Sequence, residues 1–314
     1  MQSAKRILMI GPMHETVMQH TAKHYDVLEL WRHDNPLEVL QAQGKGIEAV
    51  ITGAFFGIKN EYLDFLPDVK VVSTFGVGYD SIDTQALAER GIQLGNTPDV
   101  LNDAVADTAI ALLLAVVREV VRTDRYVREG CWPQGFYGLT PNVSGKKVGI
   151  VGLGSIGKVI AKRLGGFDCD IAYHNRSQRT DVDYAYFSSL NDLAAWSDFL
   201  IVATVGGTQT QNLINAQVLA ALGPQGYLVN IARGTVVDEE ALLKALQEKT
   251  IAGAGLDVFT NEPHVPEAFF ALDNVVLMPH LASATHETRE AMAQRVIENL
   301  EAFFQDGEVV SRVV

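Results

Sequence analysis

The sequence predicts an α/β protein made of two units in tandem, each with a parallel sheet covered by helices. Short apolar runs alternate with helical patterns along almost the whole chain, as expected for parallel strands joined by helices. A second series of such runs begins near residue 146. At 314 residues the chain also exceeds the length of one typical domain.

The first series contains four apolar runs that are typical of buried strands. They lie at 6–11, 26–31, 48–53 and 69–75. Helical patterns separate them at 14–24, 36–43 and 60–66. We expect 6–11 to be a first strand and not a signal peptide, because the apolar run is short and ends in Gly-Pro.

The second series supplies the strands of the second sheet. They are predicted at 146–154, 169–175, 197–204, 226–232, 251–259 and 274–280. Between the two series, segment 101–122 is apolar on nearly every face until its last turn, which predicts a helix buried on all sides, between domains or between subunits.

A closing amphipathic helix is predicted at 285–307, with Gly307 as its stop. Such a helix can return to the first unit and make it discontinuous. We therefore expect one discontinuous domain of residues 1–99 plus 285–314, and a second domain of residues 100–284.

The composition argues against several classes of partner. There are 25 Lys and Arg residues against 38 Asp and Glu, a formal net charge of −13, which disfavours nucleic acid and anionic membranes. The best apolar run, 109–117, is about half the length that a bilayer span needs. Cys131 and Cys169 have neither metal nor disulfide spacing, so we expect reduced thiols in a cytoplasmic protein and no metal site.

A glycine-rich turn follows the first strand of the second series. The motif GLGSIG (152–157) fits G-x-G-x-x-G, a weak signal alone, but it comes directly after an apolar strand and opens a helix. Gly152 permits the tight turn, Gly154 lets the backbone approach a pyrophosphate, and Gly157 lets the helix pack closely. The helix N-terminus then offers N–H groups to the diphosphate.

The next strand ends in a small basic cluster. A binder of NAD usually has an acidic residue about 20 residues after the glycines, but Asp168 and Asp170 come before or at the start of the strand. Its end carries Asn175, Arg176, Ser177 and Arg179. Guanidinium and hydroxyl groups suit a 2′-phosphate, so we predict NADP(H), with NAD(H) as a second cofactor. The alternative is a solvated turn with incidental arginines.

Three polar side chains follow strand ends of the second unit. Arg233 comes just past 226–232, Glu262 lies in the loop beyond 251–259, and His280 ends 274–280. Ligands of open α/β sheets bind at this edge. An arginine can hold a carboxylate and polarise a carbonyl, a histidine can move a proton, and a nearby glutamate favours the imidazolium. Singly, each has a structural explanation, and His264 is a rival acid–base candidate.

The first unit has a corresponding turn, FGVGYDSID (75–83). The amides of Val77 and Gly78 can bind an anion there, although an ordinary strand-to-helix turn explains the same residues.

Taken together, the motifs resemble those of the D-2-hydroxyacid dehydrogenase family. The segments GVGYD, VGIVGLGSIG, VNIARGTVVDEEAL, GLDVFTNEP and MPHLASAT stand in that family's order and spacing. The resemblance covers essentially the whole chain and is greatest to the glyoxylate/hydroxypyruvate reductase branch.

The resemblance implies a role for each of these residues. Arg233 would bind the substrate carboxylate and keto oxygen, His280 would protonate that oxygen, and Glu262 would hold His280. Val77 and Gly78 would bind the carboxylate. Positions near the cofactor would be Thr108, Ser155, Ile156, Thr204, Ile231, Ala232, Asp257 and Ser283. The family fold implies two Rossmann-like domains, so residues 1–99 plus 285–314 would be the substrate domain and residues 100–284 the dinucleotide-binding domain. It also implies an active-site cleft between them and a homodimer formed through the cofactor domain.

The chain departs from the family pattern in two places. The segment ATVGGTQTQNLI (203–214), with Gly206 and Gly207, replaces a proline-containing turn, which leaves the contacts around the nicotinamide open. The segment GAFFGI (53–58) places Phe55 and Phe56 in a loop that can face the substrate. A strict preference for small keto acids is therefore in doubt.

The function predicted is NADPH-dependent reduction of a 2-keto acid of the glyoxylate/hydroxypyruvate type to the D-2-hydroxy acid. One alternative is the same chemistry on a larger acid, either phenylpyruvate-type or 2-ketogluconate. An alternative of another class is an NAD(P)H-sensing binding protein on this fold, such as a corepressor, which the complete Arg–Glu–His set disfavours. A methyltransferase is disfavoured by the basic cluster and the paired first domain.

Overall fold

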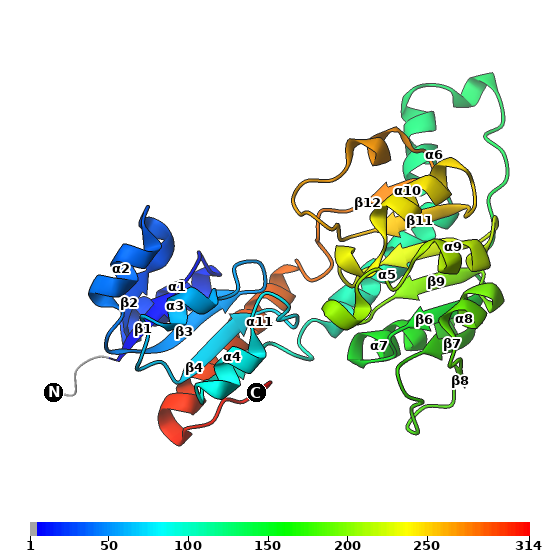
Figure 1. The fold of residues 1–314 in the computed structure, drawn as a ribbon. Helices are drawn as coiled ribbons and strands as arrows, with labels where there is room; N and C mark the ends of the chain where they lie inside the picture. Colours follow the sequence, from blue (N-terminus) through cyan, green and yellow to red (C-terminus); the bar gives the residue numbers. More distant parts are fainter. Residues whose placement is uncertain (1–4) are drawn as a thin grey trace. The chain divides into compact units, whose positions relative to one another are not determined.

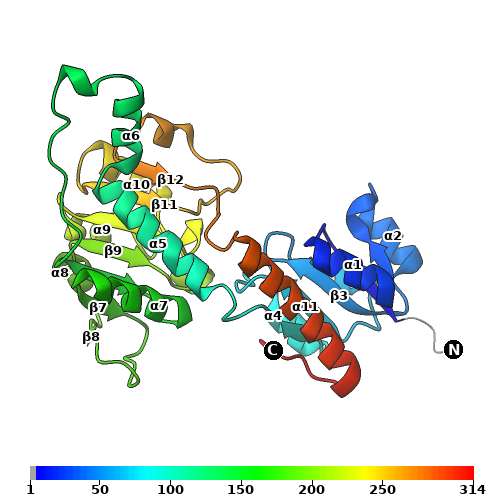
Figure 2. The same cartoon turned by 180° about the vertical axis from the view of Figure 1, so that it is seen from behind.

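The computed structural model describes residues 5–314 and divides into two compact units. The first comprises the chain up to Leu101 together with Ala284–Val314, and the second is Asn102–Ser283. Figures 1 and 2 show the elements of each unit from opposite sides, and each unit is described by itself.

The first unit has a sheet of five parallel strands in its described residues, in the order β2-β1-β3-β4-β5. The strands are β1 (Arg6–Met9), β2 (Asp26–Glu29), β3 (Ile47–Gly53), β4 (Val71–Phe75) and β5 (Gln93–Gly95). The four predicted strands are confirmed, whereas β5 was missed because its three residues give too short an apolar run. The order reverses between β1 and β3, which makes that crevice the switch point of the sheet.

Helices cover both faces of this sheet. They are α1 (Glu15–His24), α2 (Pro36–Gln43), α3 (Asn60–Leu63), α4 (Thr84–Glu89) and α11 (His286–Asp306), with a 3-10 turn at Leu30–Arg32. The predicted closing helix is confirmed as α11, and Gly307 ends it in the left-handed region at φ 81°. Its side chains Ala293, Val296 and Leu300 pack with α1 against one face of the sheet. Figure 2 shows α1 and α11 together on this face. The helices α2, α3 and α4 cover the other face.

The second unit has seven parallel strands in its described residues, ordered β12-β11-β10-β9-β6-β7-β8. Their bounds are β6 (Lys147–Val151), β7 (Asp170–His174), β8 (Ala185–Tyr186), β9 (Phe199–Val202), β10 (Tyr227–Asn230), β11 (Gly253–Leu256) and β12 (Val275–Leu277). The six predicted strands are confirmed, and the two-residue β8 was missed. The order reverses between β6 and β9, so the glycine-rich turn after β6 lies at the switch point.

Helices also cover both faces of the second sheet. They are α5 (Asn102–Val117), α6 (Val120–Arg128), α7 (Ser155–Leu164), α8 (Leu190–Trp196), α9 (Ala216–Leu222) and α10 (Glu239–Gln247). The 3-10 turns are Trp132–Gln134, Gly165–Phe167, Thr208–Thr210, Gly234–Val236 and Glu267–Ala271. One face carries α5 and α7 (Figure 2), and the other carries α8, α9 and α10 (Figure 1).

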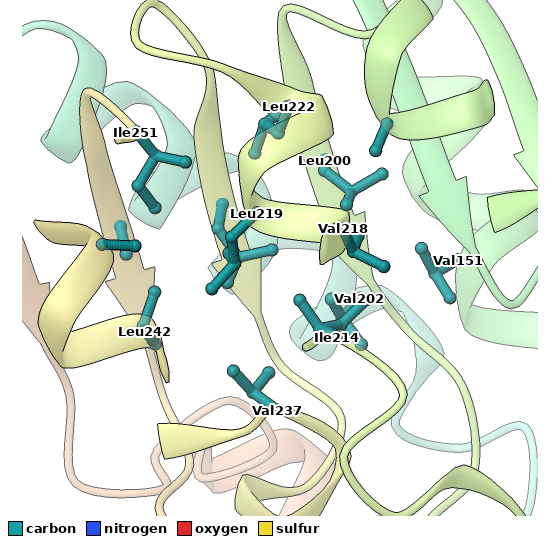
Figure 3. Packing of buried hydrophobic residues seen from close by; sticks show 14 of the residues in the cluster. Val151, Leu200, Val202, Ile214, Val218, Leu219, Leu222, Val237, Leu242 and Ile251 are labelled. Atoms are coloured by element: carbon teal, nitrogen blue, oxygen red, sulfur yellow. The ribbon is translucent and has the colours of Figure 1, made fainter. Parts of the chain in front are cut away.

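A cluster of buried aliphatic side chains fills the space beneath α8, α9 and α10. Figure 3 shows Leu219 of α9 among Leu200, Val202 and Leu242, and all four side chains are almost completely buried. Burial of such side chains stabilises a fold strongly. This layer therefore holds the helices on the sheet whose carboxyl edge carries the loops of the site.

The predicted helix at 101–122 is divided in the structure. It breaks after Val117, because Glu119 adopts the left-handed region at φ 50°, and α6 begins at Val120. In the described residues Leu112 and Leu113 are buried, Leu114 is half-buried and Ala111 is exposed. The helix α5 packs on α7 and on the strands β10, β11 and β12, and its burial against a second subunit stays a prediction.

In the part of the chain that is described, no helix is both long and apolar enough to cross a membrane. The same residues include no group of three or more His, Cys, Asp or Glu side chains placed to hold a metal ion.

Candidate active site and cofactor site

The turn after β6 can be built only with glycine at two of its positions. Gly152 has φ 97°, and a Cβ there would lie 2.7 Å from the backbone of Thr204. A Cβ on Gly157 would lie 2.3 Å from the carbonyl oxygen of Gly152. Gly154 faces open space, and no side chain of the described residues caps the N-terminus of α7 that follows it. Ser155 and Ile156 open that helix, so the turn fits a diphosphate.

Asn175 supports the glycine turn from the end of β7. Its Oδ1 accepts a hydrogen bond of 2.7 Å from the amide of Leu153, and the hydroxyl of Tyr186 donates to its carbonyl at 3.2 Å. The side chain predicted to face the ribose therefore holds the backbone of the glycine turn. It links the cofactor loop to the strand that carries the basic cluster.

The two arginines of the cluster have different surroundings. Arg179 makes two hydrogen bonds of 2.7 Å to Asp181, which also binds Lys158 at 2.5 Å. The hydrogen bonds from Arg179 hold the pKa of Asp181 well below its usual range, so this arginine is already paired with a carboxylate. Ser177 is exposed on the same turn.

Arg176 instead faces a neutral partner. Its Nη1 donates to Oε1 of Gln209 at 2.8 Å, and no carboxylate of the described residues forms a salt bridge with it. Gln209 lies in the 3-10 turn Thr208–Thr210, within the segment that departs from the family pattern. The sequence shows that this segment departs from the family pattern, but it does not identify Gln209. No local pattern shows that the Gln209 side chain reaches the end of β7.

Asp257 anchors the turn that carries His280. It is fully buried just past β11, and its two carboxylate oxygens accept from the amides of Leu281 and Ala282 at 2.7 and 3.0 Å. Its carbonyl accepts from the amide of His280 at 2.7 Å. Burial raises the pKa of Asp257 despite the two amide hydrogen bonds. Asp257 thus fixes His280, a non-glycine residue at φ 51°.

Glu262 and His280 form a close pair. Nδ1 of His280 lies 2.7 Å from Oε2 of Glu262, and the other carboxylate oxygen accepts from the amide of Phe259 at 2.9 Å. Burial opposes ionisation of Glu262, but the hydrogen bonds from His280 and Phe259 outweigh it and lower its pKa. The rival His264 is exposed in the same loop, and its amide donates to the carbonyl of Asn261.

Arg233 is held beside this pair by the turn after β10. Asn230 accepts from the amide of Ala232 at 3.1 Å and donates to the carbonyl of Arg233 at 3.0 Å. A Cβ on Gly234 would lie 1.9 Å from the carbonyl carbon of Phe259, so only glycine lets the two loops touch. The positive charge of Arg233 also contributes to the lowered pKa of Glu262.

Other predicted cofactor residues lie along the same sheet edge. Ile231 and Ala232 are buried after β10, and Thr204 lies after β9 against Gly152. Thr108 of α5 donates to the carbonyl of Ala282 at 3.4 Å, next to Ser283. The structure thus brings the residues predicted in this unit to the carboxyl ends of its strands.

Val77 and Gly78 lie in the first unit, directly after β4. Their amides donate no hydrogen bond within the described residues, while Asn96 donates to the carbonyl of Val77 at 3.0 Å. Asn299, buried in α11, donates in turn to the carbonyl of Asn96 at 3.0 Å. A buried polar chain therefore fixes this loop on its own sheet.

The fold and this site define a class of protein: a nicotinamide dinucleotide-binding oxidoreductase with a carboxylate–histidine pair and an arginine. The profile described as "D-isomer specific 2-hydroxyacid dehydrogenase, NAD binding domain" matches residues 110–282. The chain therefore belongs to the D-isomer specific 2-hydroxyacid dehydrogenase family and is an oxidoreductase of that family.

Three relatives are similar over nearly the whole chain. A glyoxylate/hydroxypyruvate reductase of Arabidopsis thaliana is 46% identical over 308 residues, 98% of each chain. A hydroxyphenylpyruvate reductase of Plectranthus scutellarioides is 45% identical with the same coverage. A 2-ketogluconate reductase of Gluconobacter oxydans is 44% identical over 314 residues, all of both chains.

A solved structure shares the fold. It is the NADPH-dependent glyoxylate/hydroxypyruvate reductase of Sinorhizobium meliloti in complex with NADP and malonate, which is 42% identical. The TM-score is 0.93, and the match covers 99% of this chain and 97% of that one. The prediction of two α/β units with parallel sheets is confirmed.

Replacing Asp257 should weaken the hydrogen bonds that hold the turn of His280 in place. In Asp257→Asn, one backbone amide would face an NH₂ group, at a cost of about 1–3 kcal/mol for an unsatisfied buried group. We expect the free energy of unfolding to fall by this amount and kcat to fall at least about tenfold. Denaturant unfolding and steady-state rates measure both. Asp238→Asn is the control, since Asp238 caps α10 and asparagine caps equally well. A fully active Asp257→Asn enzyme would contradict the anchoring role.

Proposed function

We propose that this protein reduces 2-keto acids of the glyoxylate and hydroxypyruvate type to D-2-hydroxy acids with NADPH. The observation that carries the proposal is the 2.7 Å pair of Glu262 and His280 at the strand edge that also carries Arg233. The glycine turn lies at the same edge of the same sheet. The names of the similar reductases and the NADP complex support this assignment.

When bound, the reduced nicotinamide supplies a hydride to C2 of the keto acid. Arg233 holds the substrate carboxylate and polarises the keto group, and His280 gives the proton that the oxygen needs. Because Nδ1 faces Glu262, we assign proton donation to Nε2. Glu262 orients the ring and stabilises its protonated form. We further assign carboxylate binding to the amides of Val77 and Gly78.

The cofactor would be held by groups of the second unit. The amides of Ser155 and Ile156 at the start of α7 would bind the diphosphate. Arg176 and Ser177 would bind the 2′-phosphate, because the carboxylate of Asp181 already neutralises Arg179. Gln209 would hold the guanidinium of Arg176 in place without cancelling its charge.

We also propose a cytoplasmic homodimer formed through the second unit. Large apolar side chains are exposed on α6 and in the segment after it, with Val121 49%, Phe136 79% and Leu139 92% exposed. A second copy would cover them together with Ala111 and Leu114 of α5. The two free cysteines agree with a reducing compartment.

The dimer is tested by sedimentation velocity. Wild-type protein should sediment as a dimer, and the double variant Phe136→Asp with Leu139→Asp should sediment as a monomer, because two carboxylates would have to be buried at the interface. A wild-type monomer at micromolar concentration would contradict the proposal.

Cofactor choice should depend on Arg176 and on the neutrality of Gln209. Arg176→Ala should weaken NADPH binding about tenfold or more, because hydrogen bonds to charged groups contribute roughly 1.5–3 kcal/mol, while NADH binding should hardly change. Gln209→Glu should act in the same direction by pairing with Arg176 and repelling the phosphate. Gln211→Glu, with the same charge change on an exposed neighbour, is the control. An unchanged ratio of the two dissociation constants in Arg176→Ala would refute the selector role.

The reaction itself is tested by kcat/KM for glyoxylate and hydroxypyruvate against pH, with NADPH saturating. Reduction should decline as pH rises, because His280 must be protonated. The lowered pKa of Glu262 keeps its carboxylate charged over this range.

Glu262→Gln loses that charge, so the decline should begin at lower pH. His280→Ala should be slower by about 10²–10⁴-fold. An unmoved decline would disprove the pairing, and an active His280→Ala enzyme would disprove the mechanism.

A further inference from the structure

The turn after β4 is held in place by its two carbonyl groups. The amide of Thr97 donates to the carbonyl of Gly76 at 3.0 Å. Nδ2 of Asn96 donates to the carbonyl of Val77, also at 3.0 Å. Each carbonyl shares a planar trans peptide with the amide of the next residue, and the two groups of such a peptide point in opposite directions. The amides of Val77 and Gly78 are therefore both directed away from residues 96–97.

This orientation decides whether the turn can bind an anion. Two neighbouring amides that point to the same side form a small concavity that suits a carboxylate. Gly76 and Gly78 restrict backbone rotation little, so the turn does not fix this orientation by itself. If the peptide between Val77 and Gly78 turned over, its carbonyl oxygen would face the carboxylate and repel it. The hydrogen bond from Asn96 opposes that rotation.

Asn96 is held in turn by α11 and by the C-terminal tail, which we define as Ser311–Val314. Nδ2 of Asn299 donates to the carbonyl of Asn96 at 3.0 Å, and its Oδ1 accepts from the amide of Ser311 at 2.9 Å. The amide of Asn96 donates to the carbonyl of Ser311 at 3.2 Å, which closes a ring of three hydrogen bonds. All three residues are buried. Each depends on the other two, because a buried polar group that loses its partner is costly.

The tail reaches this ring by pairing with β5, the edge strand of the sheet. The amide of Val313 donates to the carbonyl of Leu94 at 2.8 Å, and Arg312 forms an antiparallel bridge with Gly95. Only glycine fits at this point of β5, because a Cβ on Gly95 would lie 2.8 Å from Cγ of Asn299. The last residues of the chain are therefore fixed against β5 and Asn299 at the same time.

We propose, on the basis of the 2-keto acid reductase function above, that the C-terminal tail directs the amides of Val77 and Gly78 toward the substrate carboxylate. The tail acts through Asn299 and Asn96. Both are positioning residues, since they act on the backbone of the turn and not on the reacting atoms. The end of the chain thus contributes to substrate affinity as well as to the stability of the sheet edge.

A purely structural role of the tail is the alternative, and it predicts different kinetics. Loss of stability lowers the amount of folded enzyme, which reduces the apparent kcat and leaves KM unchanged. A turn whose amides are misdirected binds the carboxylate less tightly, so KM rises. Because the substrate and the transition state both carry this carboxylate, kcat changes little.

The test measures KM and kcat for glyoxylate with NADPH saturating. Asn299→Asp keeps the size of the side chain and the acceptor for Ser311, but it replaces the donor to Asn96 by an oxygen. Deletion of Ser311–Val314 removes the donor to Asn299. Both variants should raise KM about tenfold, the effect of losing one hydrogen bond to a charged group. The values of kcat and of the dissociation constant of NADPH should hardly change.

Two further variants serve as controls. Ser311→Ala removes only the hydroxyl that accepts from Arg295 at 3.0 Å, and it keeps both main-chain hydrogen bonds of the ring. Its KM should equal that of wild type. Asn274→Asp makes the same chemical change in the second unit, where Nδ2 of Asn274 donates to the carbonyls of Leu246 and Ala252. It should lower the free energy of unfolding without raising KM.

A wild-type KM in either Asn299→Asp or the deletion variant, or an equal rise of KM in Asn274→Asp, would overturn the inference and leave the proposed function intact. If neither variant folds, Asn299→Ser, whose polar side chain is shorter, is measured against the same expectation. If the wild-type enzyme reduces no keto acid, the proposed function fails, and calorimetric titration of oxalate into the protein saturated with NADP decides. Weaker binding to Asn299→Asp than to wild type supports the role of the tail, and equal or absent binding refutes it.

Discussion

The hydrogen bonds of the buried Asp257 carboxylate are the interaction on which the geometry of the His280–Glu262 pair depends. A carboxylate removed from water is costly unless hydrogen bonds compensate for its lost hydration, and here two consecutive backbone amides do so. Those amides belong to Leu281 and Ala282, immediately after His280, so compensation of the buried charge also fixes the histidine. One carboxylate oxygen of the neighbouring Glu262 accepts from the amide of Phe259, and the other lies 2.7 Å from Nδ1 of His280. Asp257 thus holds the backbone of this region, and Glu262 holds the imidazole of His280.

This arrangement explains which features the sequence can predict. Parallel strands all end at one edge, so a residue just past a strand can be placed near another such residue without knowledge of any side-chain contact. Arg233, Glu262 and His280 could be grouped on this basis, and the glycine turn could be identified from its position between a strand and a helix. The apolar strands were equally visible because burial on both faces gives continuous apolar runs.

What could not be predicted depends on contacts between segments far apart in the chain. Asn175 and Arg179 were predicted to bind the cofactor, but their partners within the chain could not be predicted: Asn175 accepts from the amide of Leu153, and Arg179 pairs with Asp181. Gln209 reaches Arg176 across 33 residues. The break after Val117 rests on the left-handed backbone of Glu119, and β5 and β8 have too few residues for a pattern. Local sequence shows which side chains are near a site, but their partners are decided by tertiary packing.

The surroundings of the arginine side chains show a feature that the two units share. In a chain of net charge −13, most arginines can find a carboxylate, and many here do. Arg176 and Arg289 instead lie against a neutral amide and an aromatic ring. Neither partner cancels the positive charge, so each guanidinium keeps its attraction for an anionic or polar group of a ligand. In the second unit this property agrees with the proposed binding of the 2′-phosphate by Arg176 at the end of β7. Each of these two guanidinium groups therefore keeps a positive charge that no salt bridge of the described residues neutralises, one beside the amide of Gln209 and the other beside the ring of Phe75.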